Sequence, residues 1–414
     1  MGDGLLSSLQ VLDLTDHQGW ACGRILADMG AEVVKVEPLG GDPSRNLGPF
    51  FGDVPHPERS LYWFSYNAGK KGITLNLDSP EGKGLLHKLS ARADILVESF
   101  QPGYLDGLGL GYEALSQANP GLIYTSITPF GLTGPRRDYK ATDLTLQALA
   151  GIACSIGEPE RQPLKMCLDQ SFVLGGSHAV IGSLLALNYR SGSGAGQHVD
   201  ISIFDCLMRL NYRDPVRWDV DKSYAQRQGN VLVRGRVNTR NIWRCKDGYV
   251  TWILAGGPTG ARENVPLTEW MVSEGVPGAE EMAQVNWMEM DLALTPQEQV
   301  DRWQDIFGSF FASRTKEELW QGGLNRRMTL VPVMDVEEAF RYEQPRARGF
   351  WHKVEHPHLN ATLEYPGHLF LSNNTRAEVR GPAPLIGEHN YEVYGSWLGL
   401  SRRQVDDLRA QGAV

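Results

Sequence analysis

Short apolar runs alternate with segments of helical spacing along the first part of the chain. Apolar runs at 11–15, 31–37, 73–77, 94–100 and 122–128 predict five strands. Segment 21–30 has helical spacing and ends at Gly30, which suits a helix C-terminus. A second helix is predicted from 79 to 90, because Ser79 suits the N-cap and Pro80 the first helical position. Strands that alternate with helices predict an α/β fold with a parallel sheet covered on both faces.

The pattern changes near residue 215. Segment 241–254 is typical of two strands around a turn at Lys246, Asp247 and Gly248, and helical segments rich in Trp and Met follow to about residue 325. This pattern predicts a second, smaller α+β domain. From about residue 330 the chain is loop-rich and ends in a helix after 398–401. Two domains also suit 414 residues, because single cores stop growing at roughly 250–300 residues.

Composition and charge are those of a soluble globular protein. Apolar residues make up 42% and charged residues 21% of the chain, and the net charge is −9. This charge disfavours nucleic-acid and anionic-membrane partners, because phosphate binding needs clustered Lys and Arg. The longest apolar stretch, 172–187, contains two adjacent glycines and several polar residues, so we expect no membrane span there.

The five cysteines are scattered and form no Cys-x-x-Cys pair, which argues against a zinc knuckle or a redox motif. An odd, scattered set suits a reducing compartment. The first ten residues lack the basic and apolar regions of a signal peptide. We therefore expect a cytoplasmic protein with no bound metal.

The loop after the first predicted strand, TDHQGWACG at 15–23, is the first candidate ligand site. It contains only Gly19 and Gly23, so it lacks the Gly-x-Gly-x-x-Gly pattern of nicotinamide and flavin sites. Open α/β sheets nevertheless bind ligands at the carboxyl ends of their strands. His17 and Gln18 therefore either contact a ligand or merely cap the following helix.

Three other segments have chemistry suited to ligands. Basic residues at 69–71, including Lys71, and at 134–140, including Lys140, are able to hold phosphate groups, although such runs are also typical of solvated surface. The glycine-rich segment GGPTG at 256–260 permits close approach of a ligand to the backbone, or simply forms a turn.

One carboxylate, Asp169, stands just before the long apolar segment that starts near 171. An acidic side chain at this position is able to form a covalent acyl intermediate. It suits equally the N-cap of the helix predicted over about 171–190. The residues alone leave both interpretations open.

Taken together, several segments resemble family III CoA-transferases, the family of formyl-CoA transferase and carnitine CoA-transferase. The resemblance covers nearly the whole chain and lies in the order and spacing of its pieces, which are 11–45, 67–83, DILVESFQPGYLDGLGLGYEAL at 94–115, ITPFGLTGP at 127–135, GQHVDISIFD at 196–205, 346–350 and 385–401. It implies a Rossmann-like large domain with an open parallel sheet, built from 1–215 and 330–414. It also implies a small domain inserted at 216–329, and two subunits that pass through each other as interlocked rings.

The resemblance also implies a reaction. In this family an Asp attacks the acyl-CoA thioester, and CoA then passes through an aspartyl thioester to an acceptor acid. When 163–166 and 175–187 are aligned without a gap, that Asp falls at Phe172, and Asp169 lies three positions earlier. Phe172 has no nucleophilic atom.

Further departures from the family occur at ligand positions. The family commonly has Lys at the position of Asp78, often Asn at that of Ser99, and in formyl-CoA transferase Arg at that of Gly107. Gln18 and Lys140 match CoA-contact positions. Together with His17 and Lys71 from the segments above and with Asp143, they form the expected CoA-binding set, with CoA as substrate and no metal.

The preferred hypothesis is a subunit without the nucleophilic Asp, paired with a paralogous chain in a heterodimer or heterotetramer, as in succinyl-CoA:benzylsuccinate CoA-transferase. Such an enzyme moves CoA from an acyl-CoA such as succinyl-CoA to a carboxylic acid, and the eleven tryptophans mildly favour an aromatic acid. Three alternatives remain. They are a self-sufficient transferase that uses Asp169, an acyl-CoA racemase, and a scaffold that binds no CoA. Racemases of this fold place a His before an Asp, and here Thr142 precedes Asp143.

Overall fold

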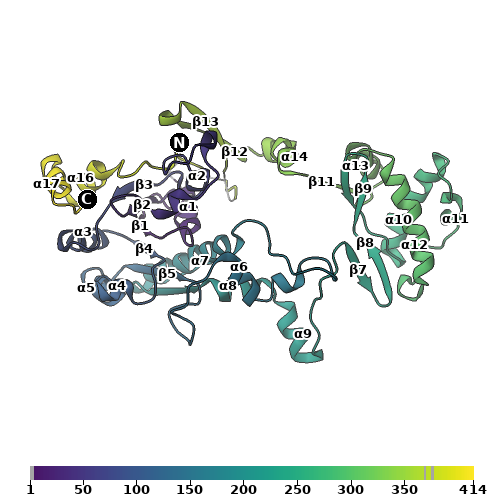
Figure 1. The fold of residues 1–414 in the computed structure, drawn as a ribbon, viewed down its shortest axis with the longest axis horizontal. Helices are drawn as coiled ribbons and strands as arrows, with labels where there is room; N and C mark the ends of the chain where they lie inside the picture. Colours follow the sequence, from purple (N-terminus) through teal and green to yellow (C-terminus); the bar gives the residue numbers. More distant parts are fainter. Residues whose placement is uncertain (1–3, 368–369, 374–376) are drawn as a thin grey trace. The chain divides into compact units, whose positions relative to one another are not determined.

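The computed structural model describes residues 4–367, 370–373 and 377–414 and divides into two compact units. Unit 1 contains residues up to Ala153, Lys165–Tyr224 and Gln344–Val414. Unit 2 contains Cys154–Leu164 and Ala225–Glu343. Residues 225–329 of the predicted small domain thus lie in unit 2. Figure 1 labels most of the helices and strands of both units.

Unit 1 is built on a six-stranded parallel sheet, which confirms the predicted α/β fold (Figure 1). Its strands, in the order β3-β2-β1-β4-β5-β6, are β1 (Gln10–Leu14), β2 (Glu32–Glu37), β3 (Lys71–Thr74), β4 (Ile95–Glu98), β5 (Ile123–Thr128) and β6 (His198–Ser202). Five correspond to predicted strands, whereas β6 was not predicted. The strand order reverses between β1 and β4, and in open α/β sheets such a reversal opens a crevice for ligands.

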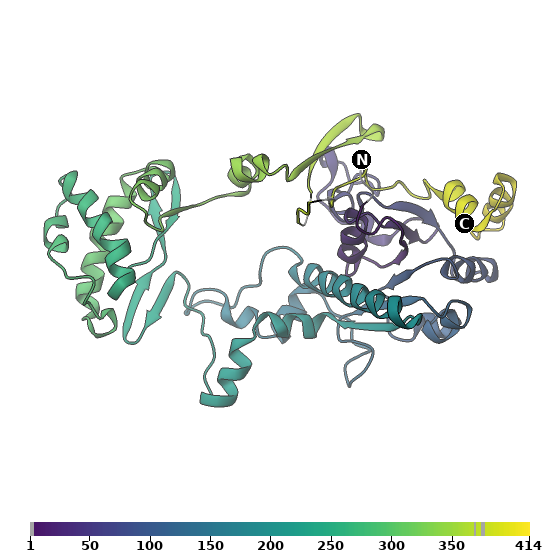
Figure 2. The ribbon, with the colours of Figure 1, turned by 180° about the vertical axis from the view of Figure 1, so that it is seen from behind.

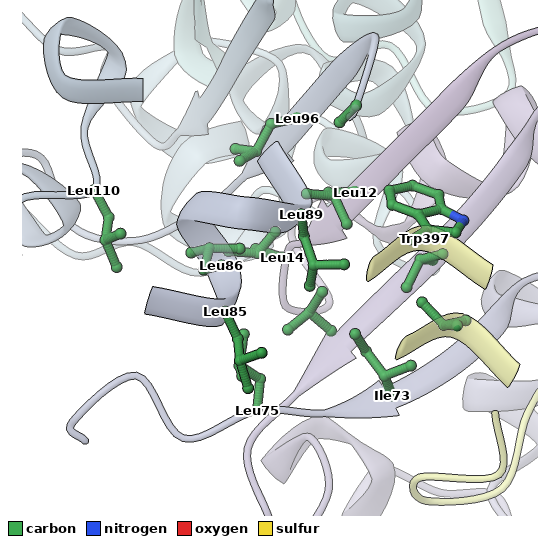
Figure 3. Packing of buried hydrophobic residues seen from close by; sticks show 14 of the residues in the cluster. Leu12, Leu14, Ile73, Leu75, Leu85, Leu86, Leu89, Leu96, Leu110 and Trp397 are labelled. Carbon is green, nitrogen blue, oxygen red and sulfur yellow. The ribbon is translucent and has the colours of Figure 1, made fainter. Parts of the chain in front are cut away.

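Helices cover both faces of this sheet. The helices of unit 1 include α1 (Trp20–Asp28), α2 (Leu61–Asn67), α3 (Pro80–Ser90), α4 (Tyr104–Gly107), α5 (Tyr112–Ala118), α6 (Asp143–Leu149), α7 (Gln170–Ser193), α8 (Ile203–Leu210), α9 (Arg213–Asp221), α16 (Asn390–Leu398) and α17 (Arg402–Ala410). Ser79 caps α3 and Pro80 begins it, as predicted. One face buries strand side chains against α3 and α16, and Figure 3 shows Leu12, Ile73 and Trp397 in this core.

The long helix α7 packs against β5, β6 and α1 (Figure 2). Gly176 permits the close approach to α1, because a Cβ there would lie 2.7 Å from the Ala21 side chain and 2.9 Å from the Cys22 backbone. By length and composition α7 is apolar enough to cross a membrane, and nearly half of its most apolar window is buried. Its contacts with α1, β5 and β6 are those of a helix that covers one face of the parallel sheet.

The chain after residue 330 has more regular structure than the predicted loop-rich tail. It contains α15 (Glu343–Ala347) and an antiparallel hairpin of β12 (Trp351–His356) and β13 (Ala361–Pro366), followed by α16 and α17. The prediction of a final helix after 398–401 is confirmed by α17, which Ser401 caps.

Short 3-10 helices in both units lie at Pro43–Asn46, Phe51–Asp53, Ala153–Ser155, Leu292–Leu294 and Pro357–Leu359.

Unit 2 has its own α+β core. An antiparallel sheet contains β9 (Ile242–Cys245), β10 (Gly248–Thr251) and β11 (Val331–Val333), and a hairpin joins β7 (Val231–Arg234) to β8 (Val237–Arg240). The predicted pair of strands around Asp247 is confirmed. Its helices are α10 (Gly257–Ser273), α11 (Ala279–Ala283), α12 (Gln297–Ala312), α13 (Lys316–Asn325) and α14 (Val336–Arg341). Five Trp and three Phe side chains, including Trp252 and Phe307, are among the 21 buried residues of this core.

Candidate functional site

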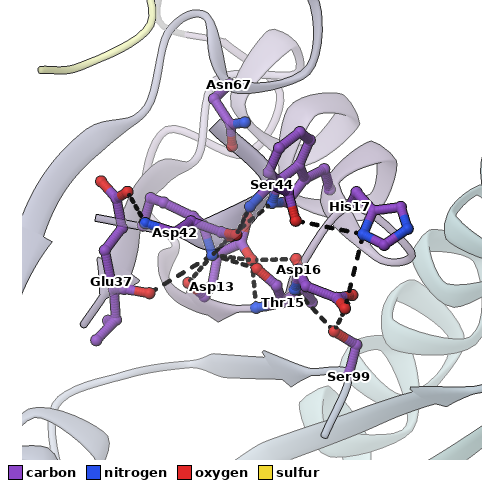
Figure 4. Close-up of polar contacts among 12 residues, drawn as sticks. Asp13, Thr15, Asp16, His17, Glu37, Asp42, Ser44, Asn67 and Ser99 are labelled. Carbon is purple, nitrogen blue, oxygen red and sulfur yellow. Dashed lines mark hydrogen bonds and ion pairs between the residues drawn. The ribbon is translucent and has the colours of Figure 1, made fainter. Parts of the chain in front are cut away.

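The candidate site lies where the strand order reverses, at the loops that follow β1 and β4. Ser99, just after β4, joins the two loops. Its hydroxyl donates to the Asp16 carboxylate at 2.8 Å and accepts from the Asp16 backbone N–H at 2.8 Å (Figure 4). The Ser99 side chain therefore holds the β1 loop in place.

A buried network of charged groups supports the β1 loop from below. The Lys70 ammonium lies 2.7 Å from the Asp13 carboxylate, and Lys35 donates to the backbone carbonyl of Thr15. Burial alone would raise the pKa of Asp13, but the two lysines hold it below its usual value. An unpaired charge is costly inside a protein, so moving Asp13 away from Lys70 would be unfavourable. The network therefore holds Asp13 and Thr15, at the start of the loop, in place.

His17 projects from this loop toward the first turn of α7. Its Nδ1 lies 3.3 Å from the Ser44 hydroxyl and 3.7 Å from the Asp16 carboxylate. Its ring is nearly perpendicular to the Phe172 ring, with centroids 5.2 Å apart. The structure thus brings together His17 and Phe172, which lie far apart in the sequence.

Gln18 is the neighbouring side chain of the same loop. Its backbone N–H donates to the Asp16 carboxylate at 3.0 Å. Its Oε1 is buried and accepts no hydrogen bond from any described residue. Buried polar atoms are normally paired, so this orphaned acceptor suits an N–H donor of a ligand, such as an amide of the pantetheine arm of CoA.

Asp169 occupies the N-cap position of α7, but its side chain makes no capping hydrogen bond. The N-cap interpretation is therefore confirmed for the position of Asp169 but not for its side chain. The carboxylate instead accepts from the Tyr62 hydroxyl of α2 at 2.7 Å. Burial and this carboxylate raise the pKa of Tyr62. Phe172 is 5% exposed and faces His17, so the two side chains have different surroundings.

Asp143, the first residue of α6, supplies the cap that Asp169 does not. Its carboxylate accepts from the Ser171 backbone N–H at 3.0 Å, in the first turn of α7. It also accepts from Lys165 at 2.9 Å and from Gln147 at 2.8 Å. Burial alone would raise the pKa of Asp143, but these hydrogen bonds hold it below its usual value. The Asp143 side chain thus positions the beginning of α7.

The two basic candidates lie in different places. Lys71 begins β3, so it lies at the edge of the sheet opposite to the carboxyl ends of the strands. Its ammonium pairs with Glu32 at 2.5 Å and with Glu392 at 2.8 Å. The structure therefore does not bring Lys71 together with His17 and Gln18. Lys140 is exposed on the loop that leads into α6.

The glycine-rich segment 256–260 forms the start of α10 in unit 2. Gly256 occupies the N-cap position, and Gly257 has a φ of +64°. A Cβ at Gly256 would lie 2.2 Å from the Met290 carbonyl oxygen. The local backbone thus accounts for these two glycines without a ligand.

A cavity of about 350 Å³ was missed by the sequence prediction. It is lined by residues at the carboxyl ends of β1, β2 and β3 and by two aromatic residues after β4, namely Leu14, Val36, Glu37, Pro38, Leu39, Leu75, Asn76, Leu77, Asp78, Phe100 and Tyr104. We call it the strand-end cavity. The rings of Phe100 and Tyr104 are stacked with centroids 4.9 Å apart. The rule that ligands bind beyond strand ends was the available signal.

Comparison with known proteins assigns this arrangement to a family. Residues 6–390 match the model of the family described as CoA-transferase family III. The chain is 32% identical over 408 residues to the protein named succinyl-CoA:(R)-benzylsuccinate CoA-transferase subunit BbsE of Thauera aromatica, with 99% of this chain and 98% of the relative covered. It is 37% identical over 419 residues to succinyl-CoA–D-citramalate CoA-transferase of Chloroflexus aurantiacus, with the same coverage of 99% and 98%. A solved structure of a CAIB/BAIF family protein from Brucella suis has a TM-score of 0.83 at 26% identity, covering 96% of this chain and 100% of that chain.

Proposed function

The chain belongs to the CoA-transferase family III, and we propose that it is the subunit of a heteromeric CoA-transferase that lacks the nucleophilic Asp. The enzyme would move CoA from succinyl-CoA to a carboxylic acid. Succinyl-CoA is proposed as the donor because it appears in the names of both relatives described above. An aromatic acceptor such as benzylsuccinate is proposed from the first of these names.

The observation that carries this proposal is the first turn of α7. Phe172, at the position that the resemblance assigns to the nucleophile, is buried against His17 and has no atom able to attack a thioester. Asp169 carries the nearby carboxylate, but this group is hydrogen-bonded to Tyr62. The name of the Thauera relative, which calls it a subunit, agrees with a role in a multi-chain enzyme.

In this proposal the paralogous partner chain supplies the nucleophile. Its Asp carboxylate attacks the thioester carbonyl to form a mixed anhydride, and the CoA thiolate leaves. The thiolate then attacks the aspartyl carbonyl and releases the donor acid. The acceptor carboxylate and the thiolate repeat these two steps in reverse, which yields the new acyl-CoA and the free Asp.

The residues of this chain would bind and orient CoA. Gln18 offers its orphaned Oε1 to an amide N–H of the pantetheine arm. His17 lies beside the buried Phe172, where the resemblance places the thioester end. Lys140 is exposed and free of any ion pair with the described residues, so it is available for a phosphate group of CoA.

Asp169→Asn tests the proposed role directly in the complex with the partner chain. We expect this variant to keep most of its activity, because an amide oxygen still accepts the Tyr62 hydrogen bond. Asp to Asn at the matching position of the partner should abolish turnover. After incubation with succinyl-CoA, trapping with hydroxylamine and peptide mass spectrometry should locate the modification on the partner.

Each alternative has its own outcome in these experiments. A modified Asp169, or a fully active homodimer, would support a self-sufficient transferase with a displaced nucleophile. Racemase activity is disfavoured because Thr142, where racemases carry a His, caps α6 through its hydroxyl. A scaffold that binds no CoA would show no thermal shift when CoA is added.

A further inference from the structure

The strand-end cavity combines apolar walls with an acidic rim. Leucines from three strand ends form much of its lining, and the stacked rings of Phe100 and Tyr104 close one side. Its volume of about 350 Å³ suits a flat ring system. The only flat aromatic part of CoA is its adenine ring, which stacks well on aromatic side chains.

The charged residues that line this cavity are Glu37 and Asp78, and no Lys or Arg is among the described lining residues. The Glu37 carboxylate accepts from Arg45 Nε at 2.6 Å and from Arg45 Nη2 at 2.7 Å. This buried ion pair balances both charges. The uncompensated charge of the cavity is therefore that of Asp78.

The position of Asp78 is fixed by its neighbours. Its backbone N–H donates to Asn76 Oδ1 at 3.0 Å. The Asn76 amide in turn donates to the carbonyl oxygen of Gly412 at 2.9 Å, near the C-terminus. A phosphate group bound at this side of the strand-end cavity would therefore lie close to the Asp78 carboxylate, whose backbone is held in place by Asn76.

The N-terminus of α3 follows directly after Asp78, and a free helix N-terminus would attract a phosphate. Here Pro80 has no N–H, the Gly82 N–H donates to the Ser79 hydroxyl at 2.9 Å, and the Lys83 N–H donates to the Ser79 carbonyl oxygen at 3.0 Å. Glu81 adds a second carboxylate in the first turn. This helix end therefore offers little compensation for the charge of Asp78.

We propose that the strand-end cavity binds the adenine ring of CoA without holding the 3′-phosphate of its ribose, so that this chain binds dephospho-CoA at least as tightly as CoA. The proposal rests on the proposed function, since it requires a CoA site in this chain. Its physical basis is the repulsion between the Asp78 carboxylate and a phosphate, with no described cation lining the cavity to offset it.

Calorimetric titration of the full chain with CoA and with dephospho-CoA, at low ionic strength, tests the proposal. For the wild type we expect a dissociation constant for dephospho-CoA equal to or lower than that for CoA. Asp78→Lys should shift the preference toward CoA by about tenfold, the scale of one charge-assisted hydrogen bond. Asp305→Lys is the matched control, because it makes the same charge change at an exposed position on α12 of unit 2 and should leave the preference unchanged.

A second variant tests whether the adenine ring occupies the cavity. Tyr104 is 42% exposed, so Tyr104→Ala should leave the fold intact. It should weaken both ligands equally, by about tenfold, through the loss of stacking. Unchanged affinity would exclude the cavity as the adenine site.

The outcomes separate this inference from the proposed function. A measurable wild-type preference for CoA over dephospho-CoA would overturn the inference while keeping a CoA site in the chain. An unchanged preference in Asp78→Lys would also overturn it. Failure of both ligands to bind would overturn the inference together with the CoA-binding role of this chain.

Discussion

Glu98, the last residue of β4, keeps its carboxyl group buried and forms no ion pair within the described part of the chain. It accepts a hydrogen bond from the Phe100 N–H at 2.7 Å, which fixes the loop that carries one wall of the strand-end cavity. Burial raises its pKa from 4.5 to about 7, because the charged form loses its hydration. This carboxyl group therefore titrates near neutral pH.

The raised pKa of Glu98 predicts a pH-dependent stability. The folded protein holds the proton more tightly than the unfolded chain, so the stabilisation is complete below pH 4.5 and is lost as the pH rises through about 7. Glu98→Gln stays neutral at every pH. Its free energy of unfolding should exceed that of the wild type by about 3 kcal/mol at pH 8 and should be nearly equal to it at pH 4.5.

Urea denaturation at the two pH values measures this difference. Glu113→Gln, at an exposed position on α5, is the matched control and should show no such dependence. An equal effect of Glu98→Gln at both pH values would contradict the raised pKa.

The two lysines of the GKK segment show what the sequence cannot distinguish at the scale of single residues. Lys70 lies just before β3 and is buried on Asp13, whereas Lys71 begins the strand and pairs with Glu32 and Glu392. Both have the same chemistry. Their partners lie far away in the sequence, so only the folded chain determines which lysine lies near the β1 loop.

At the scale of elements, the N-terminus of α7 depends on a carboxylate from α6. Asp143 accepts hydrogen bonds from Ser171, Lys165 and Gln147. We expect Asp143→Ala to lower the free energy of unfolding by about 2–4 kcal/mol, because it leaves the buried Ser171 N–H and the buried Gln147 amide without this acceptor. Asp169→Ala should cost only about 1 kcal/mol, since it removes one hydrogen bond at a half-buried position.

Denaturation of the two variants at pH 7 compares these costs under one condition. Asp143→Asn is a useful intermediate, because an amide oxygen still accepts from Ser171. A larger loss for Asp169→Ala than for Asp143→Ala would contradict the role of Asp143 as the cap of α7.

Elements whose signals are local were predicted well. The beginning of α3 follows from Ser79 and Pro80 alone, and five strands of the parallel sheet follow from continuous apolar runs. The side-chain acceptor at the start of α7 was missed because Asp143 lies 28 residues before Ser171 in the sequence. Strand β6 was missed because its side chains are only partly buried or exposed, so it has no continuous apolar run.

The candidate site was predicted only in part for the same physical reason. His17 and Gln18 could be placed on the loop after the first strand because they follow that strand directly in the sequence. The strand-end cavity was missed because its lining comes from four separate strand ends, and no single segment carries its pattern.

At the scale of the whole molecule, the two units have separate cores, and unit 1 exposes an apolar stripe on α7. We define the α7 stripe as Ile181, Leu185 and Tyr189, which are 54%, 65% and 56% exposed. They are spaced four residues apart, so they share one face of the helix. The buried residues of α7 include Gly176, Ala179 and Ser183.

Exposed apolar patches on soluble proteins mark interaction surfaces. The proposed heteromer provides an occupant, namely a related CoA-transferase chain. We expect Leu185→Glu to weaken association with that partner, because the interface would bury an unpaired charge. Coexpression with a tag on one chain, followed by affinity purification, should recover both chains in equal amounts for the wild type and much less of the partner for Leu185→Glu.

Ser191→Glu is the control, because Ser191 is exposed on the same helix but does not belong to the α7 stripe. It places the same charge two turns or less from Leu185 and should leave recovery of the partner unchanged. Circular dichroism of both variants should match the wild type, since neither side chain is part of a core. If Leu185→Glu recovers as much partner chain as the wild type does, the α7 stripe is not the surface that binds the partner. If the wild-type chain alone forms an active homodimer, the enzyme is an assembly of identical subunits and not a heteromer.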